Sequence, residues 1–161
     1  MPTLSAQALN RRSLQTSILV VEDNPDHQLL IRYVLQRAFA NTKPIFTATA
    51  EQALAYLNDC LRQKVATPNL VLLDLYLPKA EYGWNFLQQV RAFPLPQRPP
   101  VVVLSVSREE EDIRKAYQLG ATSFIAKPLG QEEWLTYFER LRQYWWETVT
   151  LPNKEDEHRY E

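Results

Sequence analysis

The sequence lacks a second cysteine, a long apolar run and an excess of charge of either sign. Cys60 is the single cysteine among 161 residues, so no disulfide can close within the chain, and its helical context favours a semi-buried thiol. No apolar run approaches the roughly 18 residues that span a bilayer, and the first residues lack an apolar stretch typical of signal peptides. The formal net charge of -1 offers no basic surface for nonspecific nucleic-acid binding. We therefore expect a cytoplasmic protein that contacts neither membrane nor nucleic acid.

Apolar runs typical of strands alternate along the chain with patterns of helical spacing. Strands are predicted at residues 18–21, 45–48, 70–73, 101–104 and 124–126. Helices are predicted from Pro25 onward and at residues 51–63, 83–92, 108–119 and 131–146. This alternation predicts an α/β fold in which helices cover both faces of a parallel five-stranded sheet. We expect the flavodoxin-like, doubly wound (βα)5 type with strand order 2-1-3-4-5.

The alternating region defines one domain, predicted at residues 16–146, which is long enough to bury a core. Residues 1–15 are polar with scattered leucines and are interpreted as an N-terminal extension. Residues 147–161 are interpreted as a C-terminal tail. The roughly 15 residues after the last predicted helix are too few for a DNA-binding or enzymatic module. The output is therefore expected to be a contact with an unknown downstream protein.

Three of the predicted strands end in charged residues. Glu22 and Asp23 follow the first strand, Asp74 follows the third, and Lys127 follows the fifth. Because the carboxyl ends of parallel strands meet at one edge, where open α/β folds bind ligands, we expect these side chains to gather there. Glu22 and Asp23 alone could equally be solvated acids at a helix N-terminus, where carboxylates are favourable. Their order together with Asp74 and Lys127 favours a site.

The clustered acids predict a metal and phosphate site. Like charges about 4 Å apart repel by roughly 4 kcal/mol at an effective dielectric of 20, so three unpaired carboxylates would be costly or partly protonated. A divalent cation removes this repulsion, and Mg²⁺ (or Mn²⁺) prefers such hard oxygen ligands. With Lys127 adding a charge for a phosphate oxygen, Asp74 could attack phosphorus in line and become an aspartyl phosphate.

At these residues the sequence resembles the receiver domains of two-component response regulators. The matching segments are residues 20–24, 72–78, 103–105 and 124–128, and the resemblance covers about residues 16–146. It implies a response regulator that accepts a phosphoryl group from a phosphohistidine of a sensor histidine kinase. It also implies that the protein catalyses only its own phosphotransfer and a slow autodephosphorylation.

The resemblance implies a role for each residue of the site. Asp74 is the phosphoacceptor and a metal ligand. Asp23 binds the metal directly, Glu22 contributes through water, and the main-chain carbonyl of Tyr76 completes the protein ligands. Lys127 assists catalysis by binding the phosphoryl group.

The resemblance also implies a switch. Ser105 is the hydroxyl residue that turns towards the phosphoryl group after transfer, and Phe124 is the aromatic residue that moves inward behind it. From the residues alone, both are more simply a strand-end and a core residue. The bond between Lys127 and Pro128 is implied to be cis.

The sequence departs from the family pattern near the acceptor. The loop between Pro78 and Gly83 is one residue longer than usual, so residues 79–82 are expected to bulge near the site. Tyr76 is bulky where smaller polar residues are frequent, and Val106 stands where the family often has Ala or Gly. Both side chains could screen the phosphoryl group from water, so we predict slow autodephosphorylation.

The last predicted helix is aromatic on two sides. One apolar stripe at helical spacing, most simply core, consists of Trp134, Phe138, Leu141 and Trp145. A second face, predicted as an interface together with Trp145, contains Tyr137, Tyr144 and Trp146. This ending resembles the single-domain regulators that accompany cyanobacterial phytochromes. The resemblance implies a phytochrome as the kinase and a homodimer through the last helix and the C-terminal tail. A tail that folds back over its own domain is the alternative.

Other functions remain possible on the sequence. A phosphorylation-independent interaction module of receiver type would need a damaged site, which the charged residues argue against. A hydrolase with an aspartyl-phosphate intermediate usually has a second acid two residues after the nucleophile, where this chain has Tyr76. A flavin-binding protein would need a cradle rich in Gly and hydroxyl groups, which residues 25–30 lack.

Overall fold

The computed structural model describes residues 16–94 and 97–144, within which five strands alternate with five helices. The strands are β1 (Ser17–Val21), β2 (Lys43–Thr47), β3 (Leu70–Asp74), β4 (Val101–Ser105) and β5 (Ser123–Ala126). The helices are α2 (Pro25–Ala38), α3 (Ala50–Gln63), α4 (Ala80–Arg91), α5 (Glu110–Gln118) and α6 (Gln131–Arg142). All pairings are parallel, in the order β2-β1-β3-β4-β5. The predicted fold class is confirmed.

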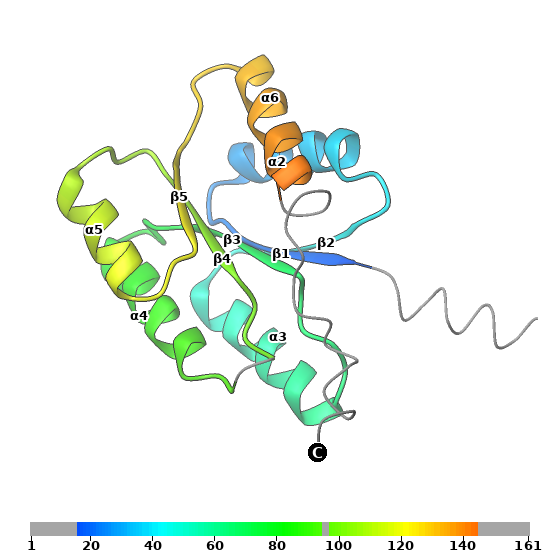
Figure 1. Cartoon of the computed structure of the whole chain (residues 1–161), viewed down its shortest axis with the longest axis vertical. Helices are drawn as coiled ribbons and strands as arrows, with labels where there is room; N and C mark the ends of the chain where they lie inside the picture. The colour runs from blue at the N-terminus through cyan, green and yellow to red at the C-terminus, as the bar shows by residue number, and fades with distance from the viewer. Residues whose placement is uncertain (1–15, 95–96, 145–161) are drawn as a thin grey trace, which may run out of the picture.

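Helices cover the sheet on both sides (Figure 1). Helices α2 and α6 lie on one face, and α3, α4 and α5 lie on the other. Within β1, Leu19 and Val21 pack on the face covered by α3, α4 and α5. Ile18 and Val20 pack on the face covered by α2 and α6. Because successive side chains of a strand point to opposite faces, a strand buried on both faces is apolar throughout. This explains why the strands appear in the sequence as short apolar runs.

Local signals set several helix ends where they were predicted. The Asn24 side chain caps α2 by accepting hydrogen bonds from the main-chain N–H groups of Asp26 and His27, with Pro25 at the first helical position. After α5, Gly120 adopts a φ of 105°, which is strained for residues with a side chain, and it stops the helix. The predicted starts and stops at these positions are confirmed.

The predicted bulge at residues 79–82 is wrong, because α4 begins at Ala80. Lys79 precedes the helix without a side-chain capping bond, so the sequence carries no ordinary signal for this start. Gly83, predicted as the first helical residue, lies instead in the first turns of α4. A Cβ atom there would lie 2.3 Å from the carbonyl oxygen of Leu75. Glycine therefore permits the loop after β3 to lie directly against α4.

The predicted cis bond is also placed wrongly. The cis X-Pro peptide bond in the described residues joins Leu77 to Pro78, and the bond between Lys127 and Pro128 is trans. Both bonds are tertiary amides whose intrinsic preference for trans is only about 0.5–1 kcal/mol. Residue type therefore does not decide the isomer, and the surrounding structure does.

Helix α6 confirms the predicted core stripe. Trp134, Phe138 and Leu141 are buried against the sheet and α2. Tyr137 and Tyr144 are exposed, so the described part of the second aromatic face is open. The predicted continuation of the helix to residue 146, with Trp145 and Trp146, lies outside the described residues. Across residues 16–94 and 97–144, no helix is both long and apolar enough to cross a membrane.

Candidate functional site

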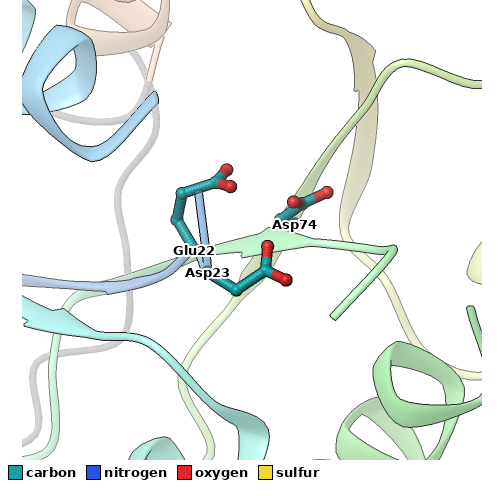
Figure 2. A group of neighbouring side chains, drawn as sticks. All are labelled: Glu22, Asp23 and Asp74. Atoms are coloured by element: carbon teal, nitrogen blue, oxygen red, sulfur yellow. The ribbon is translucent and has the colours of Figure 1, made fainter. Parts of the chain in front are cut away.

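The sheet register brings the predicted acids together at one edge. Val21 of β1 pairs with Leu73 of β3, so Glu22, which follows β1, lies beside Asp74, the last residue of β3. Asp23 follows Glu22 into the loop before α2. The carboxylate oxygens that Glu22, Asp23 and Asp74 offer all lie within 4.8 Å of one another. Figure 2 shows the three side chains gathered where β1 and β3 end.

Burial distinguishes the three acids. Glu22 and Asp74 are 1% and 8% exposed, whereas Asp23 is open to solvent. Glu22 is held in place by its neighbours: its Oε1 accepts a hydrogen bond from the main-chain N–H of Asn24 at 3.1 Å. The side chain of Gln28 donates to the Glu22 carbonyl at 2.5 Å. The acidic cluster therefore consists of two buried carboxylates and one that faces solvent.

Lys127, the residue after β5, contacts the two buried carboxylates. Its ammonium Nζ lies 2.8 Å from Oε2 of Glu22 and 3.3 Å from Oδ2 of Asp74. The residue is 6% exposed, so both ion pairs are buried. The predicted gathering of Lys127 with Glu22 and Asp74 is confirmed as geometry.

His27 was missed by the sequence analysis. Its ring atom Nδ1 lies 2.8 Å from Nζ of Lys127 and 3.8 Å from Oε1 of Glu22. The capping signal of Asn24 places His27 in the first turn of α2, and that turn begins at the edge where the acids gather. The position of His27 near the site could therefore have been predicted, although its contact with Lys127 could not.

The pKa of Asp74 is raised from 3.8 to about 7. Burial is the largest cause, because it disfavours the charged form. The cation of Lys127 opposes the rise in pKa, and the negative charge and hydrogen bonding of Glu22 add to it. Without a bound metal ion, Asp74 thus holds a proton near neutral pH, as expected for crowded carboxylates. A divalent metal fits this set, since it favours hard oxygen ligands and replaces the proton.

The two predicted switch residues, Ser105 and Phe124, lie in different environments. Ser105 ends β4 and is fully buried, and its Oγ accepts a hydrogen bond from the main-chain N–H of Ser107 at 3.1 Å. Leu104 pairs with Asp74 in the β3–β4 register, which puts Ser105 at the same edge as the acids. Phe124, near the start of β5, is partly buried and packs against the core under α3, α4 and α5.

Tyr76 lies beside Asp74, and its side chain reaches α5. Its main-chain N–H donates to Oδ1 of Asp74 at 3.4 Å, and its hydroxyl donates to Oδ2 of Asp112 in α5 at 2.8 Å. Ser107 donates to the same Asp112 oxygen at 2.6 Å. Val106, between the two serines, is 69% exposed. Asp112 and Ser107 were not singled out in the sequence. The bond from Tyr76 to Asp112 joins residues 36 positions apart, whereas Ser107 and Asp112 are five positions apart.

Comparison with known proteins gives one consistent family. Residues 18–139 match the response regulator receiver domain. The chain is 34% identical over 128 residues to the probable methanogenesis regulatory protein FilR2 of Methanothrix harundinacea (strain 6Ac), covering 80% of this chain and 82% of that protein. It is 32% identical over 136 residues to the response regulator Rcp1 of Synechocystis sp., covering 84% of this chain and 92% of that protein.

Solved structures agree with the sequence matches. The phosphorylated cyanobacterial phytochrome response regulator RcpA superposes with a TM-score of 0.76 at 31% identity, covering 86% of this chain and 99% of that one. The Mn²⁺-bound form of Rcp1 superposes with a TM-score of 0.73 at 32% identity, again covering 86% and 99%. Both similarities cover most of this chain.

Proposed function

The chain belongs to the response regulator receiver family, and on this basis we propose that Asp74 accepts a phosphoryl group from a sensor histidine kinase. Receiver domains as a family are phosphoacceptors that dephosphorylate themselves and bind Mg²⁺ or Mn²⁺ through acidic residues. Among its relatives, Rcp1 is a response regulator and RcpA is a cyanobacterial phytochrome response regulator. What the proposal adds is the assignment of these roles to residues of this chain.

One observation carries the proposal. The buried carboxylate of Asp74 lies at the carboxyl end of β3, 3.3 Å from the ammonium of Lys127. One carboxylate oxygen from each of Glu22, Asp23 and Asp74 lies within 4.8 Å of the other two. A nucleophile, a cation and a set of hard oxygen ligands at one sheet edge are the components that phosphoryl transfer requires.

The acidic cluster supplies the proposed metal ligands. Asp23 and Asp74 would hold Mg²⁺ or Mn²⁺ directly with the main-chain carbonyl of Tyr76, and Glu22 would contribute through water. When bound, the metal supplies positive charge that neutralises the phosphoryl oxygens. The raised pKa of Asp74 supports this assignment, because a cluster that retains a proton near neutral pH has negative charge to share with a cation.

In the proposed reaction an ionised Asp74 oxygen attacks phosphorus in line. The new bond is O–P, the bond from phosphorus to the kinase imidazole nitrogen breaks, and the electron pair returns to that nitrogen. Lys127 binds a phosphoryl oxygen and stabilises its charge. The Ser105 hydroxyl then donates a hydrogen bond to the phosphoryl group, and Phe124 moves inward as the second switch residue.

The partners are proposed from the relatives and from the open face of α6. RcpA is a phytochrome response regulator, which supports a phytochrome-type kinase as the donor. Tyr137 and Tyr144 are exposed on and just after α6, and Tyr is enriched in protein interfaces. We therefore propose that α6 and the C-terminal tail, with Trp145 and Trp146, form a homodimer interface, and that a downstream protein reads the signal.

The test is the intact mass after incubation with acetyl phosphate and Mg²⁺. The expected result is one added phosphoryl group in the wild type and none in Asp74→Asn. Omitting Mg²⁺ and adding a chelator should abolish the adduct. If the wild type takes up no phosphoryl group and binds no beryllofluoride, the phosphorylation-independent interaction module replaces this proposal.

A further inference from the structure

His27 touches the ammonium of Lys127 but is not one of the proposed metal ligands or the acceptor. Its Nδ1 lies 2.8 Å from Nζ of Lys127, as close as the carboxylate of Glu22. The contact joins residues 100 positions apart in the sequence. His27 therefore has a defined place in the site without an assigned role.

The ammonium of Lys127 carries three N–H groups and has two hydrogen-bond acceptors and one further ion-pair partner. These partners are Oε2 of Glu22 at 2.8 Å, Nδ1 of His27 at 2.8 Å and Oδ2 of Asp74 at 3.3 Å. Since an ammonium group only donates, Nδ1 accepts in this bond and the ring proton resides on Nε2. The Lys127 side chain is 4% exposed, so water does not readily replace a lost acceptor. The position of Nζ is thus set by two carboxylates and one imidazole.

The three partners of the ammonium differ in their other roles. Glu22 and Asp74 belong to the acidic cluster, and in the proposed function they also serve a metal ion and a phosphoryl group. The imidazole of His27 has neither duty. Its backbone is fixed because its N–H donates to the Asn24 side chain at 3.3 Å in the first turn of α2. The imidazole can therefore keep the Lys127 ammonium in place while Glu22 and Asp74 change partners.

We propose that His27 is a positioning residue for Lys127 that keeps the ammonium beside Asp74 during phosphoryl transfer; this inference rests on the proposed function. Without His27, the ammonium has one unpaired N–H and is drawn towards Glu22, which is already nearer to Nζ than Asp74 is. The misplaced ammonium then stabilises the transferring phosphoryl group less well.

Two substitutions of nearly equal shape test the role of the acceptor. His27→Asn places an amide oxygen where Nδ1 lies, and His27→Leu places a methyl group there. The phosphorylation rate at saturating acetyl phosphate and Mg²⁺ should fall about tenfold in His27→Leu, as expected for a lost hydrogen bond to a charged group, and stay within about twofold in His27→Asn. Mg²⁺ affinity, measured by calorimetry, should be the same in all three proteins. Equal losses in both variants, or a parallel fall in Mg²⁺ affinity, would overturn the proposal.

A second pair of measurements separates positioning from general damage. In a Lys127→Gln background, His27→Leu should have no further effect on the rate, and an additive loss would contradict a role through Lys127. In the metal-free wild type, the ¹⁵N-labelled ammonium of Lys127 should give an NMR signal protected from solvent exchange. Protection should disappear in His27→Leu and persist in His27→Asn, and unchanged protection in His27→Leu would count against the proposal. A wild type that is phosphorylated while the variants match it defeats this inference alone, whereas a wild type without an adduct defeats the proposed function.

Discussion

The hydroxyl of Tyr76 donates a hydrogen bond to Oδ2 of Asp112 at 2.8 Å, which connects the loop after β3 to the first turn of α5. Asp112 also accepts from the hydroxyl of Ser107 at 2.6 Å, and the N–H of Ser107 donates to Oγ of Ser105 at 3.1 Å. This hydrogen-bond chain connects the loops that follow β3 and β4. The bond to Asp112 is also the largest cause of the raised pKa of the Tyr76 hydroxyl.

This chain of hydrogen bonds leads to a prediction about the lifetime of the phosphorylated state. Tyr76→Phe removes the hydroxyl and keeps the ring, so the ring is released from Asp112 and shields the site less. The phosphorylated protein should lose its phosphoryl group severalfold faster, measured by intact mass after removal of the donor. Tyr82→Phe, an exposed tyrosine in the first turn of α4, is the matched control and should not change the decay. Equal rates of phosphoryl loss in wild type and Tyr76→Phe would show that the hydroxyl does not keep the ring in a shielding position.

Val106 gives an independent test of slow autodephosphorylation. It follows the buried Ser105, and its side chain is 69% exposed at the edge where the acids gather. Because Val106→Ala removes two methyl groups from the approach to this edge and no core contact, decay should accelerate with little effect on folding. Phosphoryl decay and thermal unfolding are compared with wild type. An unchanged decay rate would remove Val106 from the explanation.

The sequence predicted most of the site because its residues follow strands. The ends of β1, β3 and β5 place Glu22, Asp74 and Lys127 at one edge of any parallel sheet of this order. Contacts between loops were not predictable in this way. The bonds of His27 to Lys127 and of Tyr76 to Asp112 depend on how two segments approach each other, which no local pattern encodes.

The errors also have local causes. The start of α4 was predicted at Gly83, whereas in the structure this glycine lies within the helix and permits a close approach to Leu75. The preceding Lys79 gives no capping signal. The domain limits of residues 16–146 stay a prediction, and the family match at residues 18–139 lies inside them.

Gly83 yields a stability prediction. In Gly83→Ala the new Cβ would lie 2.3 Å from the Leu75 carbonyl oxygen and 2.9 Å from its Cδ1. Overpacking against main chain should lower the free energy of unfolding by about 1–3 kcal/mol, even though Ala favours a helix more than Gly does. Gly130→Ala is the control, since nothing lies within 4 Å of its added Cβ. Urea unfolding followed by circular dichroism should separate the two variants, and similar midpoints would contradict the close approach.

The open face of α6 predicts an oligomer. Tyr137 and Tyr144 are 42% and 56% exposed, and an interface through them would bury both rings. Light scattering at micromolar concentration should give the mass of a dimer, and Tyr137→Glu should shift it towards monomer because a charge would be buried. Glu132→Gln, an exposed change on the same helix, should leave the mass unaltered. A monomeric mass with and without beryllofluoride would end the homodimer proposal.

The pKa of Asp74 predicts how stability depends on pH. In the metal-free protein this pKa is about 7 in the folded state, above 3.8 in the unfolded chain, so the folded state binds the proton more tightly. The stabilisation from protonated Asp74 is complete below 3.8 and is lost as the pH rises through about 7. Urea unfolding in the presence of a chelator should therefore show wild type losing stability over this window relative to Asp74→Asn. A constant difference between the two proteins would place the proton elsewhere.

The same carboxyl group predicts competition between protons and metal. Because a metal binds the ionised form, Mg²⁺ must displace the proton of Asp74 below pH 7, and its affinity should rise with pH through that value. The increase in melting temperature caused by a fixed Mg²⁺ concentration should accordingly be larger at pH 8 than at pH 6. In Asp74→Asn the stabilisation should be weaker and nearly independent of pH in this range, since the neutral amide has no proton to release. Calorimetry in two buffers of different ionisation enthalpy measures that proton directly: wild type should release close to one proton per Mg²⁺ at pH 6, and release by Asp74→Asn to the same extent would refute the assignment.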